Sequence, residues 1–173
     1  REGILKLQFK VFRPIKPMMA QMAEDVNQAL KEAGGEMAFE YKLDGARIQI
    51  HKSNDDVRVF SRRLTDATES LPEVVQLVKD EVKAQQVIMD GEVIAVGEEK
   101  NPLLFQHVMR RFRRVHGIDE MSKQIPVELR LFDVIYLNGH SLIDLPYTER
   151  RKKLAEIVGH ILLTNQIITK DSD

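Results

Sequence analysis

The chain has 173 residues, of which 43% are hydrophobic and 31% are charged, and its formal net charge is -1. These values predict a globular protein with a substantial core and exclude a uniformly basic nucleic-acid binder, although local basic clusters can still contact phosphates. The absence of cysteine excludes disulfides and thiolate metal sites, so any bound metal must rely on oxygen or histidine ligands.

The first half of the chain reads as one helix followed by a group of strands. Residues 18–35 have apolar side chains at helical spacing and end at two glycines, which favour a helix C-terminus. Alternating apolar and polar residues predict strands over residues 37–43, 47–52 and 57–61, with a polar turn at residues 53–56. Short strands joined by a tight turn favour antiparallel pairing.

The second half alternates helices and strands. Ser70 and Pro72 are typical of a helix start, so we expect Ser70 to cap a helix over residues 72–84. The remaining pattern predicts strands over 86–96 and 127–139, the latter ending in a turn at Asn138 and Gly139, and helices over 105–114 and 146–160. The fold class is therefore α+β, with mostly antiparallel sheets flanked by helices.

The two ends and the hydropathy of the chain carry two further expectations. The chain starts at Arg1 without an initiator methionine and stops soon after the apolar "IITK", so we expect it to be part of a longer protein. No apolar run reaches the roughly 20 residues of a transmembrane helix, and there is no signal-peptide pattern. We therefore expect a cytoplasmic protein, or a nuclear one in a eukaryote, that does not contact a membrane.

The stretch "EYKLDGAR" raises the question of what Lys42 does between two strands. A lysine is a nucleophile only when it is neutral, and its reference pKa of about 10.4 leaves it protonated at pH 7. Partial burial, or a neighbouring cation such as Arg47 or a bound metal, would favour the neutral amine. Gly45 would let the backbone approach a ligand closely, and Asp44 could orient the amine. Without its neighbours, Lys42 would read as a solvated turn residue.

Four segments together resemble one enzyme superfamily. "EYKLDGAR" resembles the lysine signature shared by DNA ligases, RNA ligases and mRNA capping enzymes. "VFSRRLTDAT", "IMDGEVIAV" and "LRLFDVIYLNG" follow in the order in which that superfamily carries its phosphate-handling, ribose-binding and base-stacking segments. The upstream "RPIKPMMAQ" is similar to the lead-in of ATP-dependent DNA ligases of the archaeal and eukaryotic type.

The resemblance implies a role for each matching residue. Lys42 would be the catalytic nucleophile, Asp44 and Gly45 would support it, and Glu40 would accept a hydrogen bond from the adenine amino group. Arg47 and Arg62 would bind the phosphates of the nucleotide. Glu92 would bind its ribose and a metal, and Phe132 would stack on the purine.

Several of these residues also have ordinary structural interpretations. Glu40 could be a surface carboxylate, Phe132 a core aromatic and Glu92 an exposed position on a strand. Asp90 could bind metal, although Asp before Gly is more often a turn or strand-end residue, and Asp133 receives no assignment.

The resemblance also implies chemistry and partners. ATP with Mg²⁺ would leave AMP on Lys42, and the AMP would then activate the 5′-phosphate of nicked duplex DNA for sealing. A sliding clamp could bind through parts of the parent protein outside this chain. The alternatives are a capping-type guanylyltransferase, an RNA ligase, or a nucleotide-binding fragment without catalysis.

The fold implied is a nucleotidyltransferase (ATP-grasp-like ligase adenylation) domain, incomplete at its C-terminal end. Residues 1–173 would form this partial domain. The strands that carry a metal-supporting glutamate and two phosphate-gripping lysines, the N-terminal DNA-binding domain and the C-terminal OB-fold would lie outside the chain. We therefore expect the isolated chain to be inactive or very weak.

The sequence also contains two clusters of arginines. The arginines from Arg110 to Arg114 read as a solvated helix face, with nucleic-acid contact as the alternative, and Arg62 and Arg63 form a second basic cluster. The histidines lack the spacing of a metal site, so we assign them none.

Overall fold

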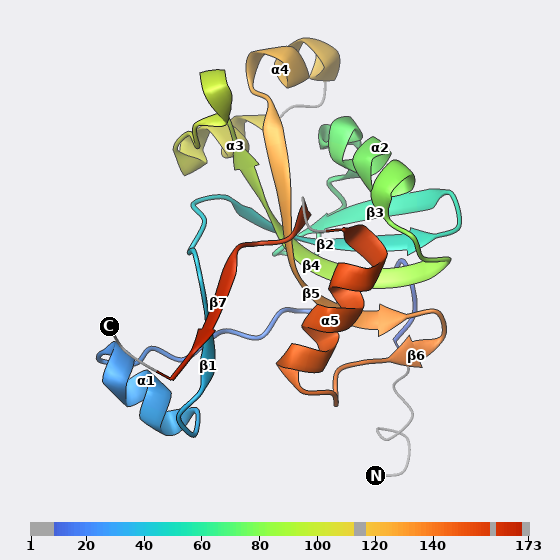
Figure 1. Cartoon of the computed structure of the whole chain (residues 1–173). Helices are drawn as coiled ribbons and strands as arrows, with labels where there is room; N and C mark the ends of the chain where they lie inside the picture. Colours follow the sequence, from blue (N-terminus) through green and yellow to red (C-terminus); the bar gives the residue numbers. More distant parts are fainter. Residues whose placement is uncertain (1–8, 113–116, 160–161, 171–173) are drawn as a thin grey trace. The chain divides into compact units, whose positions relative to one another are not determined.

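The computed structural model describes residues 9–112, 117–159 and 162–170. The chain divides into two compact units (Figure 1). The larger unit comprises residues 1–16 and 43–163, and the smaller one comprises residues 17–42 and 164–173. The α+β class expected from the sequence is confirmed, and each unit contains its own antiparallel sheet.

A five-stranded antiparallel sheet in the order β3-β2-β4-β5-β6 forms the centre of the larger unit. The two turns expected from polar residues both form. Asn54 follows β2 with φ 51°, and Asn138 and Gly139 follow β5 with φ 45° and 93°. The strands are β2 (Ala46–Ser53), β3 (Asp56–Ser61), β4 (Gln86–Ala95), β5 (Val127–Leu137) and β6 (His140–Ser141).

Helices pack on one face of this sheet. Val74 and Val78 of α2, Val108 of α3 and Leu154 of α5 share one buried apolar cluster with the strands. The helical elements of the larger unit are η2 (Thr68–Ser70), α2 (Pro72–Glu81), η3 (Glu98–Lys100), α3 (Phe105–Phe112), α4 (Ile118–Gln124) and α5 (Tyr147–Val158).

Strand alternation separates this core from a polar face. Ile48 and Ile50 of β2 and Met89 of β4 belong to the apolar cluster. Because successive side chains of a strand point to opposite faces, Gln49 and Asp90 lie on the other face. That second face carries three of the six sequence-predicted site residues of the larger unit, Arg47, Glu92 and Phe132.

The smaller unit consists of α1 (Val26–Glu32), β1 (Met37–Glu40) and β7 (Gln166–Thr169). β1 and β7 pair antiparallel, with Met37 opposite Thr169 and Glu40 opposite Gln166 (Figure 1). Asp25 caps α1 by accepting a hydrogen bond from the Gln28 N–H at 2.8 Å. Residues 18–23, which precede α1, are not helical.

Three details of the predicted elements are wrong. The helix expected over residues 18–35 begins only at Val26, because Met18, Met19 and Met22 are exposed rather than packed on a helix face. Ser70 belongs to η2, and the residue at the start of α2 is Leu71, without a side-chain cap. Neither α4 nor β7 was predicted.

The arginine-rich helix also differs from the expectation. Arg111 is only 1% exposed and donates to the carbonyls of Ile125 and Ser70 and to the carboxylate of Glu73. It therefore joins α3 to α2 and to the end of α4 instead of facing solvent. Arg110 is exposed, and Arg113 and Arg114 lie outside the described residues.

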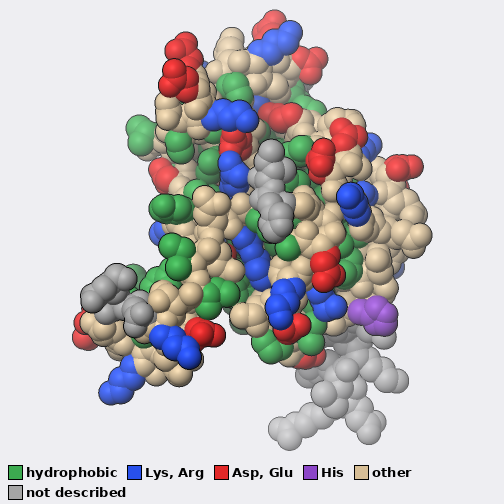
Figure 2. All heavy atoms as spheres, in the orientation of Figure 1, with side chains coloured by type: hydrophobic (Ala, Val, Ile, Leu, Met, Phe, Trp, Pro, Cys, Tyr) green, Lys and Arg blue, Asp and Glu red, His purple; other side chains and the backbone are tan. Residues whose placement is uncertain are grey.

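The exposed surface mixes the two signs of charge. Figure 2 shows Lys and Arg side chains interspersed with Asp and Glu on the face that it displays. Within the described part of the chain, no helix is both long enough and apolar enough to cross a membrane.

Candidate functional site

The sequence-predicted site residues are divided between the two units. Glu40 and Lys42 belong to the smaller unit. The other six belong to the larger unit: Asp44, Gly45, Arg47, Arg62, Glu92 and Phe132. The structure brings three of these six together.

Arg47, Glu92 and Phe132 meet on three neighbouring strands. Arg47 of β2 lies opposite Glu92 of β4 in the strand register. The Arg47 guanidinium carbon lies 5.3 Å from the centroid of the Phe132 ring, which is within the range of a cation–π contact. Phe132 sits where the β4–β5 register shifts, between the Asp90–Asp133 and Gly91–Leu131 pairs. An irregularity of this kind can redirect a side chain, and the half-buried ring lies beside Arg47.

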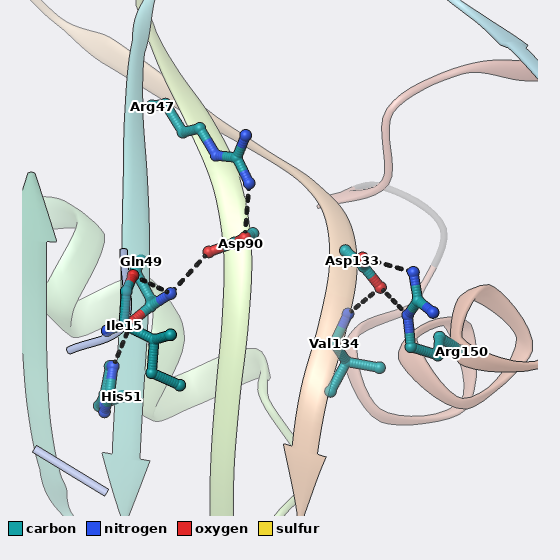
Figure 3. Close-up of polar contacts among 8 residues, drawn as sticks. All are labelled: Ile15, Arg47, Gln49, His51, Asp90, Asp133, Val134 and Arg150. Carbon is teal, nitrogen blue, oxygen red and sulfur yellow. Dashed lines mark hydrogen bonds and ion pairs between the residues drawn. The ribbon is translucent and has the colours of Figure 1, made fainter. Parts of the chain in front are cut away.

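Asp90 holds the Arg47 side chain in place. Arg47 Nη2 donates to Asp90 Oδ2 at 2.7 Å, and Gln49 Nε2 donates to Asp90 Oδ1 at 3.1 Å (Figure 3). Both oxygens of the buried carboxylate are therefore used by protein donors. This charge-assisted pair orders Arg47, a function that sequence reasoning did not assign to Asp90.

The Nε atom of Arg47 is buried and has no hydrogen-bond partner among the described residues. A buried donor without an acceptor is costly, by about 1–3 kcal/mol. A ligand with phosphate oxygens would supply an acceptor of the charge and geometry that a guanidinium prefers. The geometry thus suits Arg47 to an anion beside the Phe132 ring.

Arg62 lies in a tight turn that follows β3. Leu64 adopts a left-handed φ of 66°, and the turn is fastened by Ser61, whose backbone N–H donates to the Thr65 carbonyl at 2.9 Å. Arg62 and Arg63 are exposed there, and together with Lys16 and Leu64 they line an open hollow of about 580 Å³. Three cations around one hollow favour an anionic ligand.

Asp44 and Gly45 have structural explanations in the larger unit. Asp44 Oδ2 accepts the backbone N–H of Phe105 at 3.3 Å, at the first residue of α3. A Cβ on Gly45 would lie 2.3 Å from the Val93 carbonyl oxygen, so the residue type is dictated by close packing against β4. The structure therefore explains Gly45 by strand contact, and a ligand approach at this position stays a prediction.

Glu40 and Lys42 lie at the end of β1 in the smaller unit. Glu40 is the last residue of β1, and its Oε1 accepts a hydrogen bond from Gln166 Nε2 at 3.2 Å. Lys42 follows β1 and is exposed, so of the two causes that would favour its neutral amine, partial burial is not seen, and a neighbouring cation or metal stays a prediction.

The described part of the chain provides little for a metal ion by itself. Within residues 9–112, 117–159 and 162–170, no cluster of three His, Asp or Glu side chains could hold a metal. His51 is buried and hydrogen-bonded within the protein, whereas His116 and His160 lie outside the described residues. The metal role of Glu92 stays a prediction.

Sequence reasoning missed two polar groups on this face. Gln49 and His51 alternate with isoleucines in β2, which is typical of a solvated strand face, yet both are buried. Asp133, which was left unassigned, forms a bidentate ion pair with Arg150. Arg150 Nε lies 2.8 Å from Asp133 Oδ1, and Arg150 Nη2 lies 2.9 Å from Asp133 Oδ2. The strand sequence carries no signal of the burial of Gln49 and His51, because the contacts that cause it are long-range.

Comparison with known proteins identifies relatives over nearly the whole chain. The family described as "ATP dependent DNA ligase domain" matches residues 17–173. A DNA ligase of Thermococcus fumicolans is 48% identical over 175 residues, covering 99% of this chain, and one of Thermococcus onnurineus is 49% identical over 172 residues, covering 98%. The chain spans 31% of the length of each of these relatives.

Solved structures show the same fold. The ligase domain of M. tuberculosis LigD is 26% identical with a TM-score of 0.53, over 72% of this chain and 37% of that one. A mycobacterial DNA ligase D complexed with ATP and MES has a TM-score of 0.54 at 23% identity, over 78% of this chain and 41% of that one. These likenesses confirm the expected ligase adenylation fold. With the family match and the relatives, they show that the chain belongs to the ATP-dependent DNA ligase domain family.

Proposed function

We propose that the full-length protein is an ATP-dependent DNA ligase and that residues 1–173 are part of its adenylation domain. The observation that carries the proposal is the arrangement of Arg47, Glu92 and Phe132 on neighbouring strands, with the Arg47 guanidinium paired to Asp90 and placed over the Phe132 ring. This arrangement brings a cation and an aromatic ring together, which are the groups that a nucleotide needs for its phosphate and its base.

The first step would be covalent transfer of AMP to Lys42. The neutral Nζ of Lys42 attacks the α-phosphorus of ATP, an N–P bond forms, and the bond to the bridging oxygen breaks with release of pyrophosphate. The amine loses its extra proton to solvent, and the product is a phosphoramidate. Arg47, whose buried Nε lacks a protein acceptor among the described residues, would hold a phosphate oxygen during this attack.

The remaining nucleotide contacts divide the base from the sugar. Phe132 would stack on adenine, Glu40 would accept a hydrogen bond from its amino group, and Glu92 would hold the ribose. Asp44 and Gly45 would support Lys42 by fixing the loop that leads to β2, and their contacts with Phe105 and Val93 support this role. The family match favours ATP over the GTP of a capping enzyme.

Mg²⁺ is compatible with the residues present. Mg²⁺ usually binds through one or two carboxylates together with substrate phosphates and water, so it does not require a cluster of three carboxylates. Glu92 would be the carboxylate that holds it. When bound, Mg²⁺ would offset the negative charge of the triphosphate.

Nicked duplex DNA would be the second substrate. AMP would pass from Lys42 to the 5′-phosphate at the nick, and the 3′-hydroxyl would then displace AMP to form the phosphodiester bond. The basic hollow of Lys16, Arg62 and Arg63 supports a contact with phosphates. A sliding-clamp contact and a cytoplasmic or nuclear location stay predictions.

The decisive experiment tests for the covalent adduct. Full-length protein incubated with α-labelled ATP and Mg²⁺ should acquire acid-labile AMP, and Lys42→Ala should abolish the label. Lys123→Ala, which changes an exposed lysine on α4, is the matched control and should label normally. Saturable ATP binding without label would favour the non-catalytic alternative, and label that persists in Lys42→Ala would refute the assignment of Lys42.

A further inference from the structure

Gln49 uses its whole hydrogen-bonding capacity within the protein. Its Nε2 donates to Asp90 Oδ1 at 3.1 Å and to the Ile15 carbonyl at 3.3 Å. Its Oε1 accepts the Ile15 N–H at 2.8 Å and faces His51 Nε2 at 3.0 Å. An amide side chain has two donor hydrogens and two acceptor lone pairs, so Gln49 is saturated and its orientation is fixed (Figure 3).

His51 extends this network toward the N-terminal segment. The Phe12 N–H donates to His51 Nδ1 at 2.9 Å, so Nδ1 is the acceptor and the proton resides on Nε2, which donates to Gln49. Burial lowers the pKa of His51 to about 4, and the imidazole is therefore neutral at pH 7. The backbone of residues 12–15 is thus fastened to β2 at two points.

The other end of the network is the Arg47 guanidinium. Asp90 is only 7% exposed and Gln49 only 6%, so solvent has little access to the hydrogen bond between them. With one oxygen held by Gln49, the Asp90 carboxylate has a fixed plane, and its second oxygen receives Arg47 Nη2 at 2.7 Å. The position of Arg47 over Phe132 therefore depends on a side chain that acts through the Asp90 carboxylate.

We propose that Gln49 is a positioning residue for Arg47, which fixes the guanidinium through Asp90 and ties it to the Phe12–Ile15 segment. The proposal deepens the proposed function, because the consequence for catalysis rests on Arg47 holding a phosphate of ATP. The consequence for the order of Arg47 does not depend on that function. The two consequences are measured separately.

The first measurement follows Arg47 without any nucleotide. In full-length protein with ¹⁵N-labelled arginine, the Arg47 Nε–H signal should be resolved and slow to exchange, and it is assigned by its loss in Arg47→Lys. Gln49→Met, which keeps the length of the side chain but removes its polar atoms, should accelerate that exchange about tenfold or more, because the buried donor becomes mobile. Gln76→Leu, at an exposed glutamine of α2, should leave the signal unchanged.

The second measurement is a double-mutant cycle on the single-turnover rate of Lys42–AMP formation at saturating ATP. Gln49→Met should slow this step about tenfold when Arg47 is present and less than about twofold in an Arg47→Ala background, since the two residues act through one path. Equal slowing in both backgrounds would overturn the proposal, because a merely structural role of Gln49 would be additive.

The outcomes separate the inference from the proposed function. An Arg47 signal that does not change in folded Gln49→Met overturns the inference whether or not AMP is transferred. If the wild-type protein forms no adduct, the proposed function fails while the first measurement still decides the role of Gln49. Should Gln49→Met not fold, Gln49→Ala removes the donor to Asp90 and leaves room for water to satisfy the Ile15 backbone, and the same two readouts apply.

Discussion

Asp133 and Arg150 join β5 to α5 through two parallel hydrogen bonds of 2.8 and 2.9 Å. Asp133 also accepts the backbone N–H of Val134 at 2.8 Å. Its hydrogen bonds to Arg150, followed by the charge of its carboxylate, raise the pKa of that guanidinium, which stays charged at every accessible pH. The pair secures the irregular part of β5 that presents Phe132.

Loss of this pair should destabilise the larger unit. Asp133→Ala leaves a largely buried guanidinium without its carboxylate, so we expect a loss of about 2–3 kcal/mol in the free energy of unfolding. Glu149→Ala is the control, because its ion pair with Lys152 is exposed and should contribute about 0.5 kcal/mol or less. Denaturant titrations of the full-length variants would compare the two, and equal effects would contradict the prediction.

Phe132 should contribute to ATP affinity. Stacking of a base on an aromatic side chain is worth about 1–3 kcal/mol, so Phe132→Ala should weaken ATP binding about tenfold or more in the folded protein. Phe105→Ala removes a partly exposed ring at the start of α3 and should leave the affinity unchanged. Calorimetric titration with ATP provides the comparison. Unchanged affinity in folded Phe132→Ala would return Phe132 to an ordinary packing role.

His51 should make the larger unit less stable in acid. The pKa of His51 is about 4 in the folded protein and about 6.5 in the unfolded chain. Between these two pH values the unfolded state binds a proton at His51 and the folded state does not. The neutral His51 therefore makes its full contribution to the free energy of unfolding above pH 6.5. This contribution decreases as the pH falls toward 4 and does not change further below pH 4. The total loss is about 3 kcal/mol.

Two measurements check this pH dependence. NMR of the imidazole should show no titration of His51 until the pH approaches 4. Between pH 7 and pH 4.5, the free energy of unfolding should fall less in His51→Gln than in the wild-type protein, because glutamine does not titrate. A His51 imidazole that titrates near pH 6.5 would show that the ring is not held neutral by burial.

Gly45 should not tolerate a side chain. In Gly45→Ala the new Cβ would meet the Val93 carbonyl oxygen at 2.3 Å and the Glu92 Cγ at 2.9 Å, so β2 would have to move away from β4. We expect a loss of about 3 kcal/mol, at the upper end of overpacking effects. In Gly97→Ala the nearest atom is a side-chain carbon of Leu103 at 3.1 Å, which can shift, and the loss should be smaller. Thermal unfolding of both variants would reveal an equal loss if strand contact is not the reason for Gly45.

The sequence predicted the elements whose patterns are local. Alternation located β2, β4 and β5, and Asn138 with Gly139 marked the turn after β5. The helix over residues 18–35 was drawn too long because Met18, Met19 and Met22 imitate the apolar face of a helix, although all three side chains are exposed. β7 was missed because its identity depends on pairing with β1, which is distant in the sequence.

The candidate site was predictable to a similar extent. The motifs indicated Arg47, Glu92 and Phe132, which strand pairing brings together. Gln49 and His51 occupy the positions of a solvated strand face, yet Phe12 and Ile15 of the N-terminal segment bond to them and Phe60 packs against the His51 ring. These contacts are made with other segments and have no signature in the strand itself.

The pairing of β1 with β7 closes residues 41–165 into a long loop. In an unfolded chain, closing so long a loop carries a large entropic cost. Once the larger unit has folded, however, residues 43 and 163 are already fixed within it, and the two strands meet at a high effective concentration. The smaller unit should therefore fold last and open first, and its backbone amides should exchange with solvent long before those of the five-stranded sheet.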